Sequence, residues 1–266
     1  VFQRDSMMDI VQKFIMLQGK NLIFPRYHQR RAVLNLVGDV KERGAGHRYL
    51  IQHSAGSGKS NTITWLAFRL SNLYKTVEDE KPIFDSVLVV TDRRVLDRQL
   101  QNNLRQFQIT EGEVKYIDNK CNSQDLKKAI EERKRIIVTT LQKFPVISDT
   151  IHLFPDRKYA VIIDEAHSSQ SGEAARQMRK ALSLEEAEAF DAEDAKGADP
   201  EDILNNIIEG EIDRKGFKHN ISFFAFTATP KQKTIELFCE RENGQKKPFD
   251  EYTMEDAINA DRIFNL

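Results

Sequence analysis

A glycine-rich stretch between residues 53 and 60 contains the residue types that a phosphate-binding loop needs. It has the sequence His53-Ser-Ala-Gly-Ser-Gly-Lys-Ser60, and the apolar residues Tyr49–Ile51 precede it. Glycines at 56 and 58 let the backbone turn so that successive N–H groups point at one anion. A helix that begins near Lys59 would direct its positive dipole end to the same point. The spacing therefore predicts a P-loop that binds a nucleoside triphosphate.

Each residue of this loop has an expected role. Lys59 would reach the β- and γ-phosphates, and the hydroxyl of Ser60 would bind Mg²⁺. The usual first glycine of the pattern is His53 here, which leaves a plain glycine-rich turn as the alternative. The predicted nucleotide-binding residues of the loop are Ser54, Ala55, Gly56, Ser57, Gly58, Lys59 and Ser60.

Two adjacent carboxylates, Asp164 and Glu165, follow the apolar run Ala160–Ile163. A carboxylate at the carboxyl end of a buried strand beside a P-loop can hold the Mg²⁺ that bridges the phosphates, and this is the role we expect for Asp164. Glu165 is placed to polarise the attacking water as a general base. An Asp-Glu pair alone is common, but here it follows an apolar strand, lies downstream of a P-loop and is completed as Asp-Glu-Ala-His. We therefore predict Lys59, Asp164 and Glu165 as the catalytic residues.

A third polar group, Thr227-Ala-Thr229, also comes directly after an apolar strand. Its hydroxyls could bond the Asp-Glu-Ala-His segment and sense the γ-phosphate. His167 lies close enough in the chain to connect that segment to the rest of the domain. We expect His167, Thr227 and Thr229 to couple the nucleotide site to other parts of the protein.

Gln29 lies shortly before the P-loop strand, near the start of an expected helix. Its amide can donate to and accept from the edge of adenine at the same time, which would select ATP. The alternative is a polar residue on the exposed face of that helix.

The elements that must position these groups alternate between apolar strands and amphipathic helices. The expected strands are Tyr49–Ile51, Ser86–Thr91, Val114–Ile117, Ile136–Thr140, Tyr159–Ile163 and Ile221–Phe226. The expected helices begin at Ser6, near Phe24, near Lys59, after Arg94, at Gln124 and at Gly172. Strands that are apolar throughout and alternate with helices indicate a parallel sheet that is covered on both faces. The predicted fold class is α/β.

The net charge of −1 conceals an uneven distribution. The segment from Ser183 to Lys215 contains twelve acidic and three basic residues, so it carries −9 and leaves +8 on the rest of the chain. A basic body with one acidic insert fits a polyanionic partner. The two cysteines, Cys121 and Cys239, lack metal-ligand spacing and indicate free thiols in a reducing compartment. Without a long apolar run or a signal-peptide pattern, we expect a cytoplasmic protein of a bacterium or archaeon that has no membrane partner.

The order of P-loop, Asp-Glu-Ala-His and Thr-Ala-Thr resembles that of superfamily 2 helicases and translocases, whose first RecA-like lobe carries these motifs. Further stretches resemble the motor (R) subunit of type I restriction endonucleases. These stretches are Arg26–Gln29, His53–Ser60, Val89–Leu100, Val138–Phe144, Asp164–Gly172, Phe226–Pro230 and Tyr252–Ile258. The resemblance implies a RecA-like P-loop fold and a DEAH-box motor that hydrolyses ATP with Mg²⁺ to translocate duplex DNA in a restriction–modification system.

The resemblance also implies roles for individual residues. Arg26 would assist Gln29 at adenine. The residues that it places against the phosphate backbone of DNA are Arg93, Arg94, Thr139, Thr140 and Lys143. Such contacts position the protein without reading sequence. For Arg93 and Arg94 the alternative is an ordinary solvated helix start.

The implied partners are double-stranded DNA and the methyltransferase and specificity subunits of the restriction complex. The implied organisation has three parts. Residues 1–25 form a helical lead-in from an upstream nuclease domain, residues 26–250 form the first RecA-like lobe with the acidic insert at about 183–215, and residues 251–266 form a junction toward a second RecA-like lobe.

Other functions remain open at this point. One alternative is a helicase or remodelling ATPase of the same superfamily that acts on RNA or chromatin. A different class is a nucleotide-gated binding module or a P-loop kinase for a small molecule. A kinase would need an acceptor pocket and a lid, and it has no use for hydroxyls at the Thr-Ala-Thr strand end.

Overall fold

A computed structural model describes residues 3–18, 20–91, 104, 113–117, 123–143, 147, 150, 151, 153–164, 205, 208, 209, 220–239, 241, 242 and 245–264. The helices are α1 (Arg4–Lys13), α2 (Tyr27–Arg43), α3 (Lys59–Ser71), α5 (Ser123–Glu131), the 3₁₀ turn η1 (Leu141–Lys143), α10 (Gln232–Phe238) and α11 (Met254–Phe264). The strands are β1 (Met16–Gln18), β2 (Asn21–Ile23), β3 (Arg48–His53), β4 (Ser86–Thr91), β5 (Val114–Tyr116), β6 (Ile136–Thr140), β7 (Tyr159–Asp164), β8 (Ile221–Thr227), β9 (Arg241–Glu242), β10 (Gln245–Lys246) and β11 (Asp250–Tyr252).

Seven strands form a central sheet in the order β11-β3-β8-β7-β4-β6-β5, and every pair of neighbours in it is parallel. All residues of β4, β6, β7 and β8 are buried, which explains why these strands are apolar throughout rather than alternating. This sheet and its helices confirm the predicted α/β, RecA-like fold class.

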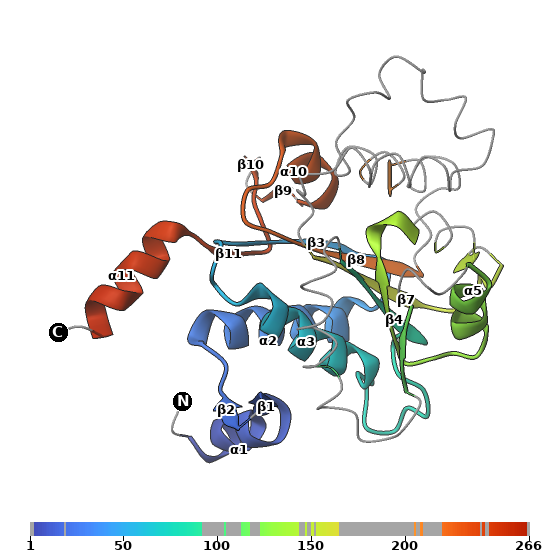
Figure 1. Ribbon diagram of the computed structural model, residues 1–266, viewed down its shortest axis with the longest axis horizontal. Coiled ribbons are helices and arrows are strands. Elements are labelled where there is room, and N and C mark those ends of the chain that lie inside the picture. The colour runs from blue at the N-terminus through green and yellow to red at the C-terminus, as the bar shows by residue number, and fades with distance from the viewer. Residues whose placement is uncertain are drawn as a thin grey trace.

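Helices cover both faces of the sheet, and the side chains of each strand alternate between two cores. One core joins α2 and α3 to residues such as Ile51, Val89 and Ile162. The other joins α5 and α10 to residues such as Leu50, Val90 and Ile163. In Figure 1, α2 and α3 lie below the sheet and α10 lies above it, while α11 projects away from the body.

The N-terminal segment packs on α3 and extends the first core. Phe14 is fully buried and its ring lies 5.8 Å from that of Trp65, while Asp9 accepts hydrogen bonds from Arg30 and Arg69. The helix was expected to begin at Ser6, but α1 begins at Arg4 after an N-cap of Gln3 that makes no side-chain cap. The carboxylate of Asp9 forms ion pairs with Lys13, Arg30 and Arg69.

Two other boundaries differ from the sequence-based expectation. The second helix was expected to run from near Phe24 to Val40. It begins at Tyr27, continues to Arg43 and stops at Gly44, which has a φ of 85°. The proposed division between residues 250 and 251 falls inside β11, which is an edge strand of the main sheet.

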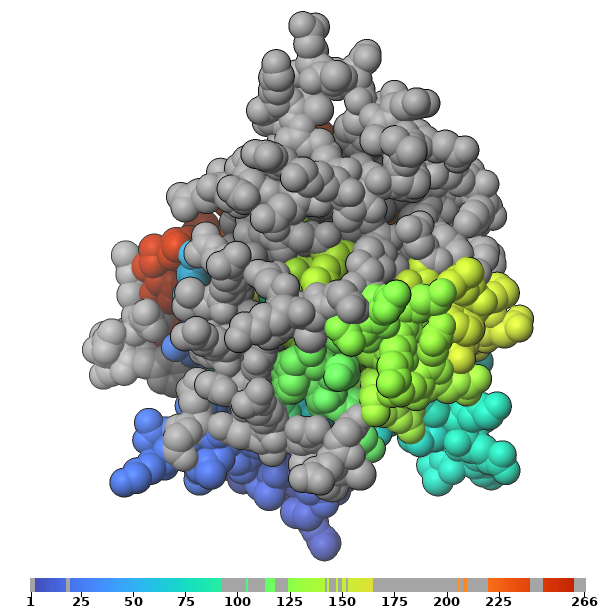
Figure 2. All heavy atoms as spheres, turned by 45° about the vertical axis from the view of Figure 1, so that its right-hand side comes forward, coloured from blue at the N-terminus to red at the C-terminus, as the bar shows by residue number. Residues whose placement is uncertain are grey.

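The opposite edge of the sheet is formed by β5, with α5 beside it. Figure 2 shows these residues in green on the face turned to the viewer, above the loop around residues 74–83 in turquoise. Among the described residues, no helix has the length and hydropathy required to cross a membrane. Cys239 is a free thiol, and burial raises its pKa to about 11.

Candidate nucleotide-binding site

The predicted P-loop connects β3 to α3 at the carboxyl edge of the sheet. Gly56 and Gly58 both have positive φ, 78° and 82°, and Gly58 is the N-cap of α3. Among the described residues, the backbone N–H groups of Gly56, Gly58, Lys59 and Ser60 have no hydrogen-bond acceptor. Free N–H groups around a helix N-terminus form a concave site for an anion. The loop therefore has the backbone geometry that a phosphate-binding loop requires, as its sequence predicted.

The side chain of Lys59 packs against the backbone of the loop. It is 8% exposed, and its Nζ donates to the carbonyl oxygen of His53 at 3.3 Å. Ser60 follows at the second position of α3 and is partly exposed. Both residues thus lie at the mouth of the loop, where a phosphate and its metal ion would be bound.

Gln29 lies on α2 and contacts the P-loop from one side. It is 3% exposed, so the alternative of a polar residue on an exposed helix face is wrong. Its Nε2 donates to the carbonyls of Ser57 (3.1 Å) and Gly58 (3.0 Å), and its Oε1 accepts from the backbone N–H of Arg26 at 2.8 Å. Both N–H donors of the amide are used by these bonds, whereas Oε1 keeps one lone pair. An adenine contact that needs the amide as a donor would have to replace one of the bonds to the loop carbonyls, and this role stays a prediction.

The polar strand ends that were predicted from the sequence lie along the same edge of the sheet. Gln52 of β3 is in register with Thr227 of β8, and Phe226 of β8 is in register with Asp164 of β7. Asp164 is 4% exposed and Thr227 is fully buried, whereas Thr229 lies beyond the strand and is exposed. The parallel sheet thus places Asp164 two strands from the P-loop strand. Glu165 and His167 lie outside the described residues.

The residues expected to contact DNA have different environments. Thr139 and Thr140 are buried in β6, with exposures of 1% and 4%. A DNA phosphate could not reach either hydroxyl unless the atoms that cover it moved. Lys143, in the turn η1, is partly exposed and is the better placed of the three. Arg93 and Arg94 lie outside the described residues, and DNA contact by this group stays a prediction.

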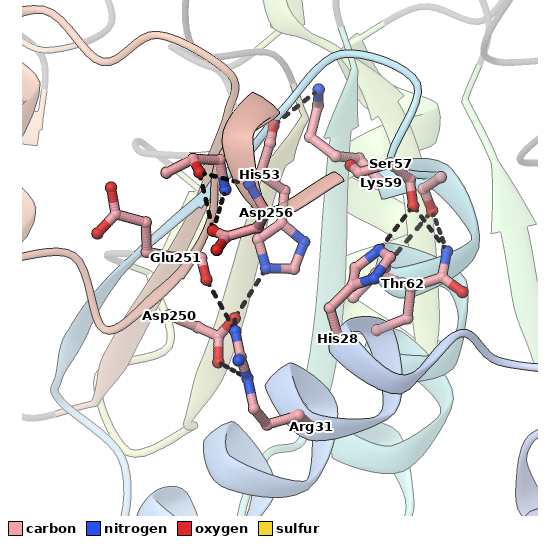
Figure 3. Close-up of polar contacts among 12 residues, drawn as sticks. His28, Arg31, His53, Ser57, Lys59, Thr62, Asp250, Glu251 and Asp256 are labelled. Atoms are coloured by element: carbon pink, nitrogen blue, oxygen red, sulfur yellow. Dashed lines mark hydrogen bonds and ion pairs between the residues drawn. The ribbon is translucent and has the colours of Figure 1, made fainter. Parts of the chain in front are cut away.

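Four residues that sequence reasoning did not select surround the start of the P-loop. They are His28, Arg31, Asp250 and Tyr252. Figure 3 shows the carboxylate of Asp250 between the guanidinium of Arg31 and the ring of His53. The one available signal was His53 itself, an unusual residue at the first position of the loop. No local pattern pointed to its partner 197 residues away.

Two of these groups have shifted pKa values. Burial lowers the pKa of His28, although the hydrogen bond to the Ser57 carbonyl works in the opposite direction, so the ring is neutral at pH 7. Burial alone would raise the pKa of Asp250. Hydrogen bonds from His53 and Arg31 outweigh burial and lower it, so this carboxylate is ionised at pH 7.

These residues fit a nucleotide with a divalent cation. The loop supplies N–H donors and one lysine for phosphates, and Ser60 and Asp164 supply the oxygen ligands that Mg²⁺ prefers. Among the described residues, no three His, Cys, Asp or Glu side chains are grouped to hold a metal.

Similarity to known proteins agrees with the motifs. The chain is 28% identical over 194 residues to the putative type I restriction enzyme MjaIXP endonuclease subunit of Methanocaldococcus jannaschii, covering 68% of this chain and 17% of that protein. It is 30% identical over 164 residues to the type I restriction enzyme SauMSSORF170P endonuclease subunit of Staphylococcus aureus, covering 60% of this chain and 16% of the relative. The chain thus spans less than a fifth of the length of these relatives.

A solved fragment of a putative HsdR subunit of a type I restriction enzyme from Vibrio vulnificus overlaps 88% of this chain and 31% of its own length. Its TM-score is 0.45 and its sequence identity is 16%. The resemblance to type I restriction subunits that was inferred from the motifs is confirmed by the curated relatives.

A sequence model for the SWI2/SNF2 ATPase matches residues 28–191, which include Gln29, the P-loop and Asp164. With more than half of its length matched and a P-loop of the required geometry, the chain belongs to the SWI2/SNF2 ATPase family.

Proposed function

We propose that this chain is the ATP-binding motor lobe of a type I restriction endonuclease R subunit, in which ATP hydrolysis drives movement along duplex DNA. The observation that carries the proposal is the P-loop between β3 and α3, with Asp164 two strands away at the same edge of the sheet. The names of the curated relatives support the restriction assignment. Because the chain spans less than a fifth of them, the activity of the whole protein is part of the proposal.

The residues of the site would divide the work as follows. Lys59 and the N–H groups at the start of α3 bind the phosphates, and Lys59 exchanges its bond to the His53 carbonyl for one to a phosphate oxygen. Ser60 and Asp164 hold Mg²⁺, which would neutralise charge on the phosphate oxygens. Glu165 orients and deprotonates the attacking water. Gln29 and Arg26 select adenine, and Thr227, Thr229 and His167 relay the state of the γ-phosphate.

The partners in this proposal follow from the restriction assignment. Duplex DNA would contact Arg93, Arg94 and Lys143 through its phosphates, whereas a second RecA-like lobe would close the ATP site. Methyltransferase and specificity subunits would supply site recognition, in the bacterial or archaeal cytoplasm. A nuclease domain in the parent chain would cut the DNA.

A remodelling ATPase or another superfamily 2 helicase is the second candidate, because the matching family is named for SWI2/SNF2. Both candidates use the same ATP site, so the site does not discriminate between them. The two candidates are distinguished by measuring ATP turnover of the full-length parent. Bare duplex DNA, RNA and nucleosomes are compared as activators. Stimulation by bare duplex DNA supports the restriction motor. Stimulation by RNA or by nucleosomes alone supports the second candidate.

The ATP site itself is tested by replacing Lys59 with alanine. The variant should lose at least tenfold in affinity for Mg·ATP, because a phosphate contact made by a charged side chain contributes more than about 1.4 kcal/mol. Lys128→Ala, which removes an exposed lysine from α5, should bind as the unmodified chain does. Isothermal titration at pH 7.5 measures the Mg·ATP affinity of the unmodified chain and of both variants. Equal affinities for Lys59→Ala and Lys128→Ala would remove the P-loop assignment.

A further inference from the structure

The first residue of the P-loop, His53, is connected to the far end of the described chain. Its ring is fully buried, and its Nε2 lies 2.8 Å from Oδ1 of Asp250 in β11. This is the only polar contact of the ring among the described residues. Since the ionised carboxylate of Asp250 can only accept, the Nε2 of His53 is the donor in this bond.

Asp250 is held in place from its other side. Arg31 donates to both of its oxygens, with Nε–Oδ2 at 3.1 Å and Nη2–Oδ1 at 3.0 Å, and also to the carbonyl of Glu251 at 2.8 Å. Arg31 balances the charge of the carboxylate, and the Nε2 of His53 completes the hydrogen-bonded cluster around it. The carboxylate is therefore a fixed anchor rather than a flexible surface group (Figure 3).

A second set of contacts joins β11 to the same loop. The backbone N–H of Ser54 donates to the carbonyl of Tyr252 at 2.9 Å. The ring of Tyr252 stacks on that of His28, with centroids 3.7 Å apart and planes 7° apart. The Nε2 of His28 lies 3.0 Å from the carbonyl of Ser57. β11 thus contacts the loop at His53 and Ser54 directly and at Ser57 through His28.

These contacts converge on the lysine that binds phosphate. The Nζ of Lys59 donates to the carbonyl of His53, so the backbone that β11 fixes is the backbone on which Lys59 rests. β11 pairs with β3 through only three residues, which is a weak hold for an edge strand without added side-chain contacts. The side-chain cluster therefore adds to the strand pairing of β3 in fixing where the start of the loop lies.

We propose that Asp250 is a positioning residue of the phosphate site, which acts through His53 on the P-loop backbone and Lys59. The proposal rests on the proposed function in one respect, that the P-loop binds Mg·ATP. The competing explanation is that Asp250, His53 and Arg31 only stabilise the edge of the sheet. In a variant that remains folded, the positioning role predicts weaker binding of the phosphates, whereas the stabilising role predicts unchanged binding.

The experiment uses His53→Ala and Asp250→Asn, alone and combined. His53→Ala leaves the Arg31–Asp250 pair intact, while it removes the bond of the ring to Asp250 and its contacts with the rings of His28 and Tyr252. It therefore keeps the test valid if Asp250→Asn fails to fold. Isothermal titration measures Mg·ATP affinity, and displacement of a fluorescent nucleotide measures affinity for AMP, which lacks the β- and γ-phosphates. Circular dichroism confirms that each variant is folded at the temperature of the titration.

We expect each single variant to bind Mg·ATP about tenfold more weakly and AMP unchanged, because the lost contact acts on Lys59 and the loop. The double variant should be no weaker than the single ones, since both remove one connection. His53→Gln should restore affinity to within threefold, because its amide can donate to Asp250. If the cluster only stabilised the edge of the sheet, its removal would not weaken Mg·ATP binding while leaving AMP binding unchanged.

Asp9→Asn is the matched control. Asp9 is another carboxylate bound by basic side chains, Lys13, Arg30 and Arg69, but it has no contact with the loop. It should lower stability and leave the ATP affinity unchanged. Folded His53→Ala that binds Mg·ATP as tightly as the unmodified chain would overturn the positioning role. A failure of the unmodified chain to bind Mg·ATP would instead overturn the proposed function.

Discussion

At the scale of single residues, the P-loop shows two glycines that meet different constraints. Both Gly56 and Gly58 have positive φ, which disfavours any residue with a side chain by about 1–2 kcal/mol. A Cβ on Gly56 would meet no atom within 4 Å, whereas a Cβ on Gly58 would overlap the amide nitrogen of Gln29. Only Gly58 is therefore required by packing as well as by backbone conformation.

Substitution of Gly58 can be tested with Gly56 as the control, because both have positive φ. Gly56→Ala should cost about 1 kcal/mol of unfolding free energy from backbone strain alone. Gly58→Ala should cost at least about 1 kcal/mol more, because Gln29 must leave its buried bonds to the loop carbonyls. Urea unfolding followed by the fluorescence of Trp65, the single tryptophan, measures both. Equal costs for the two variants would show that Gln29 moves away freely.

The sequence predicted the loop and Asp164, and it did not predict the surroundings of His53. The loop is a local pattern, and strand ends in a parallel sheet meet at one edge, so both follow from the order of elements. The partner of His53 depends on β11 lying beside β3, a pairing of three residues separated by about 200 positions. Nothing in a short strand such as Asp250–Tyr252 encodes its neighbour.

At the scale of elements, the N-terminal segment is joined to the core of the main sheet by a buried aromatic residue. Phe14 follows α1 and packs against Trp65 of α3, and the guanidinium groups of Arg30 and Arg69 lie 5.9 and 5.5 Å from the centre of its ring. A helix was expected here from its apolar spacing, but the hairpin β1–β2 that follows was not. With strands of three residues each, the hairpin shows too little alternation to be recognised in the sequence.

Phe14→Ala tests whether this segment is part of the core. We expect a loss of about 3 kcal/mol or more in unfolding free energy, the usual cost of removing a buried phenyl ring. Leu22→Ala serves as the control, because Leu22 lies in the same segment and is 59% exposed; its cost should stay within about 0.5 kcal/mol. Denaturant unfolding measures both. A small effect of Phe14→Ala would mean that the segment is separable from the lobe.

At the scale of the whole molecule, stability should depend on pH through groups at the P-loop. The pKa of His28 is lowered in the folded state, so the unfolded chain takes up a proton as pH falls through about 6.5 while the folded chain resists it. The unfolding free energy should therefore decrease with falling pH from about 6.5 down to the folded pKa. The lowered pKa of Asp250 gives stability above about 3.8, which is lost as pH falls through its folded value.

His28→Gln separates these two windows. Glutamine can still donate to the carbonyl of Ser57, and it does not titrate. In the variant, the unfolding free energy should depend less on pH just below pH 6.5. The slope should fall by at most about 1.4 kcal/mol per pH unit, the limit for one proton. The pH dependence below pH 4 should be unchanged. Urea unfolding at half-unit steps from pH 3.5 to 8 gives both curves. Parallel curves for the two proteins throughout would exclude His28 as the source.

The order of strands in the sheet also governs when the phosphate site can exist during synthesis. β3 ends at residue 53, but its neighbours β8 and β11 begin at residues 221 and 250. At roughly 5–20 residues per second, β3 leaves the ribosome about ten to forty seconds before both of its edges can be paired. Until β8 has emerged, β3 and the glycine-rich loop that follows it have no strand beside them. The nascent chain therefore carries the P-loop motif long before its surroundings are complete. If Asp250 positions the loop as proposed, nucleotide can stabilise the fold fully only after about residue 252 has emerged.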